Sequence, residues 1–114
     1  MSRHDDLIRL RHMRDHAAEA IAMTRYKKRS DLQQDRMLEL ALVRLMEIIG
    51  EAAGRVSPET RAQLPGLPWS DVVAMGNRLI HGYDSVDPDI LWTTIKDDLP
   101  YLLKAVERLL AEME

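Results

Sequence analysis

The segment from Met75 to Asp84 gathers the residue types in this chain that could do chemistry. His81 could act as a general acid or base, because an imidazole ordinarily titrates near neutral pH. Arg78 could hold a phosphate group through two parallel hydrogen bonds. Asn77 and Tyr83 could position a substrate. Such a group, with no metal ligands beside it, suits cleavage of RNA by its own 2′-hydroxyl, a reaction that needs a base and charge stabilisation but no cation.

A helix over residues 69–81, followed by Gly82, is predicted to present these side chains. Asn77 and Arg78 precede His81 by four and three residues, so a continuous helix would place all three on neighbouring faces. The spacing alone also allows a structural interpretation, in which His81 caps the last carbonyl groups of the helix and Arg78 is an ordinary surface residue.

Start and stop signals predict an all-α fold, an up-and-down bundle of four main helices plus a short one, in a single domain over residues 1–114. Ser30 has the spacing of a capping box, Ser57-Pro58 resembles the start of a short helix, and Pro100 should kink or split the last helix. The predicted helices cover residues 5–28, 31–53, 58–62, 69–81 and 88–111.

The predicted helix over residues 31–53 is the most apolar segment, and its polar residues occupy only a narrow part of its circumference. A helix of this kind is buried on more than one side. In a chain of 114 residues, the second buried side is expected to face another subunit, which predicts a homodimer or a higher oligomer built from it.

Composition favours a soluble cytoplasmic protein. The chain has no cysteine, which favours a reducing compartment and excludes a cysteine-based zinc site or nucleophile. No apolar run approaches the roughly 20 residues of a membrane span, and the charged N-terminus does not resemble a signal peptide. Aromatic residues make up 4% of the chain, fewer than is usual for proteins that stack single strands on aromatic platforms.

Two further clusters leave alternatives open. Arg25, Lys27, Lys28 and Arg29 surround Tyr26 and could contact phosphates, or could equally be the solvated end of a helix. His12 and His16 have a spacing that can bind a metal, but no glutamate follows His12 and no third ligand is evident. Exposed surface histidines are the simpler interpretation, so neither a metal nor a cofactor is predicted.

The chain resembles the HepT toxin branch of the HEPN superfamily. The resemblance rests on Arg78-Leu79-Ile80-His81-Gly82-Tyr83 with the following Asp84-Ser85-Val86-Asp87, and on Arg36-Met37-Leu38 through Ile48-Ile49-Gly50-Glu51-Ala52. It continues through Pro68-Trp69 and Ile90-Leu91-Trp92. It implies a dimeric helical bundle with two copies of the motif along a shared cleft. It also implies a metal-independent endoribonuclease that acts as the toxin of a type II toxin–antitoxin pair.

The resemblance further implies a partner, a minimal nucleotidyltransferase antitoxin that adenylylates Tyr83. A bulky anion added two residues after His81 would oppose phosphate binding by its size and its charge.

One residue departs from the family pattern. The family has an arginine directly before the asparagine of the motif, where this chain has Gly76. A glycine inside a helix costs about 1 kcal/mol relative to alanine, so Gly76 is not expected to serve stability. Arg78, or a basic residue of the partner subunit, could replace the missing charge. The alternative is a catalytically weakened HEPN protein that binds nucleotide or the transferase partner without cleaving RNA.

Overall fold

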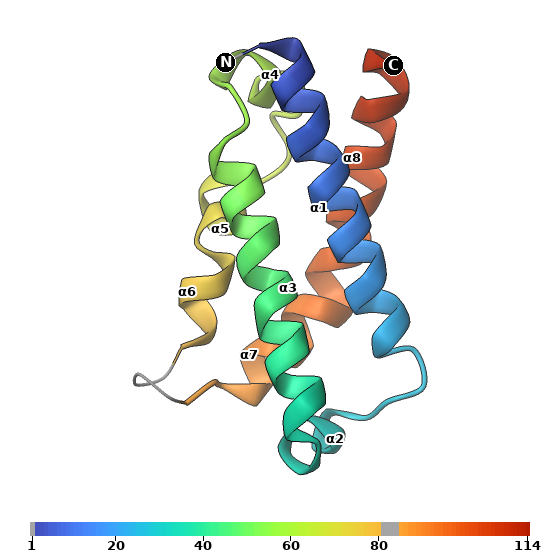
Figure 1. Cartoon of the computed structure of the whole chain (residues 1–114), viewed down its shortest axis with the longest axis vertical. Helices are drawn as coiled ribbons and strands as arrows, with labels where there is room; N and C mark the ends of the chain where they lie inside the picture. The colour runs from blue at the N-terminus through green and yellow to red at the C-terminus, as the bar shows by residue number, and fades with distance from the viewer. Residues whose placement is uncertain (1, 81–84) are drawn as a thin grey trace.

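The predicted all-α bundle is confirmed by the computed structural model, which describes residues 2–80 and 85–114. Three long helices form the frame: α1 (Arg3–Met23), α3 (Arg36–Gly54) and α8 (Leu99–Met113). α1 packs against both α3 and α8, and the three lie side by side along the long axis (Figure 1). The shorter elements are α2 (Arg29–Gln34), α4 (Pro58–Arg61), α5 (Trp69–Val73), α6 (Met75–Leu79), α7 (Pro88–Thr93) and the π-helical turn η1 (Thr94–Asp98).

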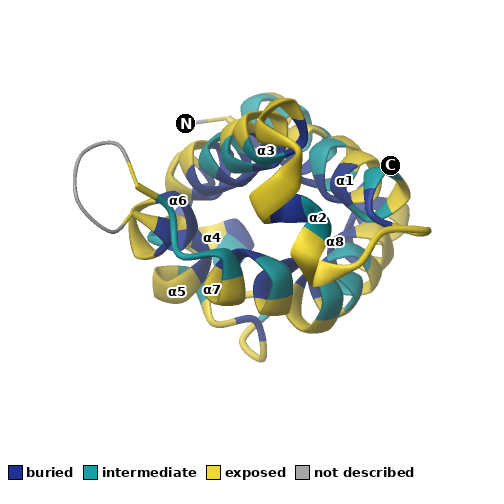
Figure 2. Cartoon of the chain, turned by 90° about the horizontal axis from the view of Figure 1, so that it is seen from below, coloured by how far each residue is buried: buried dark blue, intermediate teal, exposed yellow. Residues whose placement is uncertain are grey.

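The core lies between the long helices, whose buried sides face one another and whose exposed sides face outward (Figure 2). Burying such a stripe is the main driving force for packing helices of this length. The largest fully buried side chains include Leu10, Met13, Leu42, Met46, Ile49, Leu102 and Leu109.

The first helix ends earlier than the predicted limit at residue 28. The hydroxyl of Thr24 donates to the carbonyl oxygens of Ala20 at 3.0 Å and Ile21 at 3.2 Å. A side chain that bonds the preceding turn in this way competes with the backbone for the same carbonyl groups. α1 therefore stops at Met23, and residues 25–28 form an exposed turn.

The predicted helix over residues 31–53 is interrupted. The backbone leaves helical geometry at Asp35, whose φ of −121° and ψ of 94° are extended, and its carboxylate accepts a hydrogen bond from the backbone of Leu38 at 3.1 Å. Asp35 thus caps α3. Ser30 is not the cap of the preceding helix, because α2 begins at Arg29 and the Asp31 carboxylate accepts from the backbone N–H of Lys28 at 2.7 Å.

A buried carboxylate joins the start of α1 to the start of α4. Asp6 is 2% exposed and accepts hydrogen bonds from the backbone N–H of Ser57 at 3.0 Å, from the Ser57 hydroxyl at 2.6 Å and from the Thr60 hydroxyl at 2.6 Å. Ser57 also caps α4, as predicted, by accepting from the backbone of Thr60. Burial by itself raises the pKa of Asp6, but these hydrogen bonds stabilise the ionised form and lower the pKa below its usual value.

Pro100 distorts the last helix, as the sequence predicts. Proline has no N–H to donate, and its ring collides with the carbonyl group four residues earlier. The chain relieves this conflict by widening into η1, between α7 and α8, without leaving helical geometry. Within η1, the Lys96 ammonium donates to the carbonyl oxygen of Thr24 at 2.7 Å and so ties the turn to the end of α1.

Gly50 lets α3 approach α5 very closely. A Cβ atom at this position would lie 2.8 Å from the carbonyl oxygen of Val73 and 3.2 Å from that of Val72. Both are backbone atoms, so the two helices would have to move apart to accept any side chain. The packing of α5 on α3 therefore depends on this glycine.

We expect Gly50→Ala to lower the free energy of unfolding by about 1–3 kcal/mol, the usual cost of overpacking. Gly54→Ala is the matched control, because a Cβ there would meet only the Val73 side chain at 3.7 Å and 4.0 Å, which is ordinary contact. Gly54→Ala should leave the free energy of unfolding unchanged or raise it by up to about 1 kcal/mol. Urea unfolding of both variants measures the difference, and equal stabilities would contradict the close approach at Gly50.

Candidate active site

The helix that carries the candidate residues is shorter than predicted. It divides at Ala74 into α5 and α6, and α6 ends at Leu79 instead of continuing to His81. Ile80 is extended, with φ of −79° and ψ of 127°. The prediction of a continuous helix through residue 81 is therefore wrong, and helical spacing no longer supports placing Asn77, Arg78 and His81 on neighbouring faces. His81 and Tyr83 themselves lie outside the described residues.

Contacts between the flanking residues explain why α6 stops. Ile80 forms an isolated antiparallel bridge with Val86, and the backbone N–H of Asp87 donates to the carbonyl oxygen of Leu79 at 2.8 Å. Asp87 then caps α7 by accepting from the backbone of Asp89 and Ile90. The described residues on either side of 81–84 are thus held next to each other, at the end of α6 and before the start of α7.

Gly76 is a packing residue. It is buried, and a Cβ atom on it would lie 3.0 Å from Cγ and 3.2 Å from Cα of Glu47 in α3. Either Glu47 or α6 would have to shift to accept a side chain. Gly76 thus has a packing contact that its sequence context did not indicate, because the absence of a side chain lets α6 lie directly on α3.

Asn77 lies on the side of α6 that faces α3. It is exposed and lines a groove of about 250 Å³ with Glu47, Glu51 and Val73. The Arg44 guanidinium lies 3.6 Å from the carboxylate of Glu47 and 3.8 Å from that of Glu51. These exposed pairs offset part of the negative charge of the groove.

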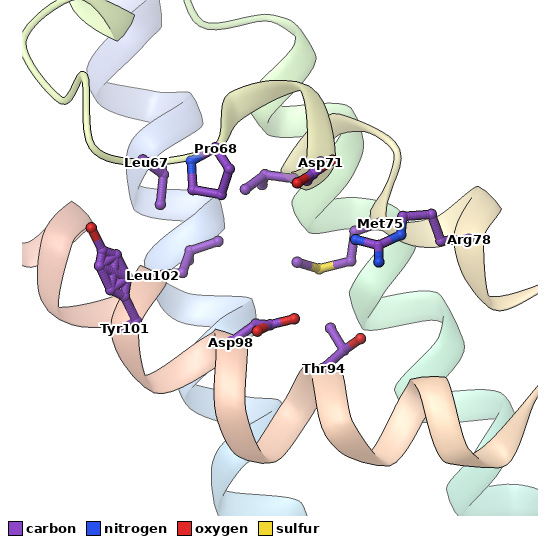
Figure 3. A pocket seen from close by; sticks show the side chains of 10 residues that line it. Leu67, Pro68, Asp71, Met75, Arg78, Thr94, Asp98, Tyr101 and Leu102 are labelled. Carbon is purple, nitrogen blue, oxygen red and sulfur yellow. The ribbon is translucent and has the colours of Figure 1, made fainter.

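Arg78 lies on another side of the same helix. Its guanidinium reaches into a pocket of about 120 Å³ between the α5–α6 segment and the η1–α8 segment (Figure 3). Asp71, Thr94 and Asp98 direct polar groups toward the same space. Neither Asp71 nor Asp98, nor any other carboxylate in the described ranges, lies within 4.0 Å of the Arg78 guanidinium as an ion pair. The guanidinium therefore keeps its hydrogen-bond donors available for an anion.

The structure therefore separates two of the predicted site residues. Asn77 and Arg78 line different pockets, on different sides of α6. Sequence reasoning missed Asp71, Thr94 and Asp98, which come from two elements far apart in the chain. No local signal in the sequence marked these residues, because only the fold brings α5 and η1 to the same pocket.

The basic cluster lies in the exposed turn between α1 and α2. Tyr26 is 90% exposed, and the guanidinium of Arg29 pairs with the carboxylate of Asp89 in α7 at 2.6 Å. This turn lies at the end of the bundle opposite the two termini, as α7 does (Figure 1). Cations are thus present on the same end of the molecule as the start of α7, which follows the candidate segment.

The histidine pair on α1 is explained by local contacts. The Nδ1 atom of His16 lies 2.7 Å from the carbonyl oxygen of His12, and the two rings meet edge to face at 6.1 Å between centroids. Across residues 2–80 and 85–114, no three His, Cys, Asp or Glu side chains come together in a group that could hold a metal ion.

Comparison with known proteins identifies the class to which this bundle and its motif belong. The model of the HepT-like ribonuclease family matches residues 13–109, nearly the whole chain. The chain therefore belongs to the HepT-like family of the HEPN superfamily, as the resemblance in its sequence indicated.

Several relatives share most of its length. "Putative RNase MJ1380" of Methanocaldococcus jannaschii is 33% identical over 107 residues, which cover 94% of this chain and 98% of that protein. "Probable ribonuclease HepT" of Thermococcus cleftensis is 37% identical over 79 residues, 69% of this chain and 72% of that protein. "Putative RNase TTE0752" of Caldanaerobacter subterraneus is 39% identical over 80 residues, 70% and 71% of the two chains. No solved structure matches the chain significantly.

In the part of the chain that the structure describes, no helix is both long enough and apolar enough to span a membrane.

Proposed function

We propose that this chain is a metal-independent endoribonuclease that acts in the cytoplasm as the toxin of a type II toxin–antitoxin pair. Membership of the HepT-like ribonuclease family supports the reaction class. The observation that carries the proposal is the guanidinium of Arg78 at the mouth of a pocket, three residues before His81, where no carboxylate of the described residues pairs with it. A charge kept free in this way is what a reaction at a phosphate group requires.

In the proposed reaction, the neutral imidazole of His81 removes the proton from a ribose 2′-hydroxyl. The resulting oxygen attacks the adjacent phosphorus atom and forms a 2′,3′-cyclic phosphate. The bond to the 5′-oxygen breaks, that oxygen takes a proton from water, and the imidazolium of His81 returns its proton to the hydroxide that remains. Arg78 donates to the non-bridging oxygens, on which negative charge accumulates in the transition state. The step consumes no oxidant and needs no metal.

We assign Asn77 to the subunit interface of a homodimer. Asn77 lines the groove along α3 and not the Arg78 pocket, and α3 and the end of α6 expose large apolar side chains. Met37 is 82% exposed, Leu40 51% and Ile80 48%. An exposed apolar strip with polar residues around it is typical of a protein–protein interface. Pairing two such faces would bring two copies of the motif to one cleft, where Asn77 and Tyr83 position the substrate.

The proposed control acts on Tyr83. Its hydroxyl oxygen attacks the α-phosphorus of ATP, held by the nucleotidyltransferase antitoxin, and pyrophosphate leaves. The added AMP carries negative charge, so it competes with the RNA phosphate for Arg78.

One observation favours a second function, a HEPN protein that does not cleave RNA. Because Gly76 packs against Glu47, the arginine of the family pattern would require Glu47 or α6 to shift at this position. If Arg78 did not replace it, the chain would bind nucleotide or the transferase without cleaving RNA.

Growth of bacteria that express this chain alone, beside bacteria that express His81→Ala, separates the two functions. A ribonuclease should arrest growth and fragment the extracted RNA, and both effects should disappear with His81→Ala. Normal growth and intact RNA in both cultures, with both proteins present at equal levels, would leave the non-cleaving function.

A further inference from the structure

The pocket beside Arg78 has the size and the lining of a site for a single aromatic ring. Its floor is apolar and buried, formed by Leu67, Val72, Met75 and Leu102. Its volume is about 120 Å³. A closed apolar cavity of about 150 Å³ holds a benzene molecule, so an open pocket of this volume can take a six-membered ring and leave its edge at the mouth.

The polar groups at the mouth are mainly hydrogen-bond acceptors. The carboxylates of Asp71 and Asp98 face the space from opposite walls, and Thr94 lies beside Asp98 (Figure 3). Carboxylates accept hydrogen bonds and cannot donate them when ionised. They therefore favour a ring that carries an amino group at its edge, and disfavour one that presents a carbonyl oxygen there.

A free anion fits this mouth poorly. Two carboxylates accompany one guanidinium, so the net charge around the opening is negative. A ligand with an amino group near the two carboxylates and a phosphate group at Arg78 would complement both the negative and the positive part of the opening. This is the arrangement of charge in a nucleotide.

Space for the rest of a nucleotide lies next to the pocket. Arg78, Thr94 and Asp98 also line a second hollow of about 240 Å³, which continues to Asp89 and Ile90 at the start of α7. α7 follows directly on the segment that contains the motif. Arg78 thus stands between a ring-sized pocket and an open hollow that reaches the start of α7.

The polar wall of the pocket comes from the widened turn η1. Thr94 and Asp98 are four residues apart, and the turn brings both to the pocket, with Thr94 only 8% exposed. Single π-helical turns inside α-helices occur frequently at functional sites.

We propose that this pocket binds the base of an unpaired cytosine in the RNA. The proposal rests on the ribonuclease function. A pyrimidine ring would lie between Met75 and Leu102, and its exocyclic amino group would donate to Asp98 or Asp71, as acidic side chains do when they recognise cytosine. The phosphate of the same nucleotide would reach Arg78. Uracil presents a carbonyl oxygen where cytosine presents the amino group, so the pocket selects between the two.

Nuclear magnetic resonance of the full chain with ¹³C-labelled methionine methyl groups tests the proposal, with the Met75 signal assigned from Met75→Leu. Cytidine monophosphate should shift the Met75 signal and bind about 10-fold more tightly than uridine monophosphate, as expected for one good base contact. Asp98→Ala should remove most of this preference. Asp97→Ala is the matched control, because Asp97 is exposed in the same turn, carries the same charge and does not line the pocket.

The proposal would be overturned by equal binding of the two nucleotides or by a preference for adenosine monophosphate. It would also be overturned if Asp97→Ala lost as much of the preference for cytidine monophosphate as Asp98→Ala. An unchanged Met75 signal would overturn it as well. The mononucleotides are not substrates for cleavage, so this result does not depend on whether the chain cuts RNA. A selective pocket in a chain that leaves RNA intact would contradict the ribonuclease function alone, and RNA cleavage without a selective pocket would contradict this inference alone.

Discussion

Arg78→Ala is expected to cleave RNA about 10² to 10³ times more slowly than the unmodified chain, the usual loss when one preorganised charge partner of a transition state is removed. The buried side chains of Met75 and Leu79 hold α6 against the core, so the position of Arg78 on the helix is fixed before substrate binds. Rates under single-turnover conditions measure the effect on the chemical step.

Arg78→Lys should recover only part of the rate, because lysine keeps the charge but not the two parallel hydrogen bonds. Arg108→Ala is the matched control. Arg108 is an exposed arginine on α8 that does not line the Arg78 pocket, so its loss removes the same charge without touching the proposed site. If Arg78→Ala retained the full rate, a different cation would have to replace the arginine missing at Gly76.

Asp6→Ala is expected to lower the free energy of unfolding at neutral pH by about 3 kcal/mol. The variant leaves the Ser57 N–H and the hydroxyls of Ser57 and Thr60 without their acceptor in a buried site, and unsatisfied buried groups are costly. It should also loosen α4 from α1. Asp15→Ala on the same helix is the control, because Asp15 is exposed and its pair with Arg14 contributes little.

The difference between Asp6→Ala and the unmodified chain should depend on pH. The pKa of Asp6 is lower in the folded chain than its usual value of 3.8. The ionised carboxylate therefore stabilises the fold fully above pH 3.8, and this contribution is lost as the pH falls through the lower, folded value. Urea unfolding at pH 7 and at successively lower pH should show the two stabilities converging in acid. A constant difference would contradict the role of the ionised carboxylate.

The helices were predictable wherever a local signal decided them. Ser57 and Pro58 start α4 by capping chemistry alone, and Pro100 distorts the last helix because it lacks an N–H group. The apolar periodicity of α3 and α8 predicted their inward faces. Each of these features depends on residues within one or two turns of helix.

Boundaries set by competing local bonds were predicted incorrectly. The Thr24 hydroxyl ends α1 early, and Asp35 starts a new helix within an apolar run that predicted continuity. α6 ends at Leu79 because Asp87, eight residues later, takes up the carbonyl group of Leu79. In each case, continuation of the helix competes with another hydrogen bond that ends or restarts it.

Features of the site that depend on tertiary contacts could not be predicted from one sequence. The sequence suggested only that Gly76 replaces the arginine of the family pattern, whereas the structure shows that Gly76 packs against Glu47 between α6 and α3. Asp71 and Asp98 gave no signal, because only the fold brings α5 to η1. Asn77 and Arg78 are adjacent in sequence but line different pockets, which α6 separates.

The most direct test of the central claim is cleavage of single-stranded RNA by the purified chain in the presence of a metal chelator, beside His81→Ala purified in the same way. We predict cleavage by the unmodified chain, products that end in a 2′,3′-cyclic phosphate, and a loss of at least about 10²-fold with His81→Ala, the contribution typical of a general acid or base. Equal cleavage by both proteins, or intact RNA with both at equal helical content, would contradict the claim that His81 serves a metal-independent ribonuclease.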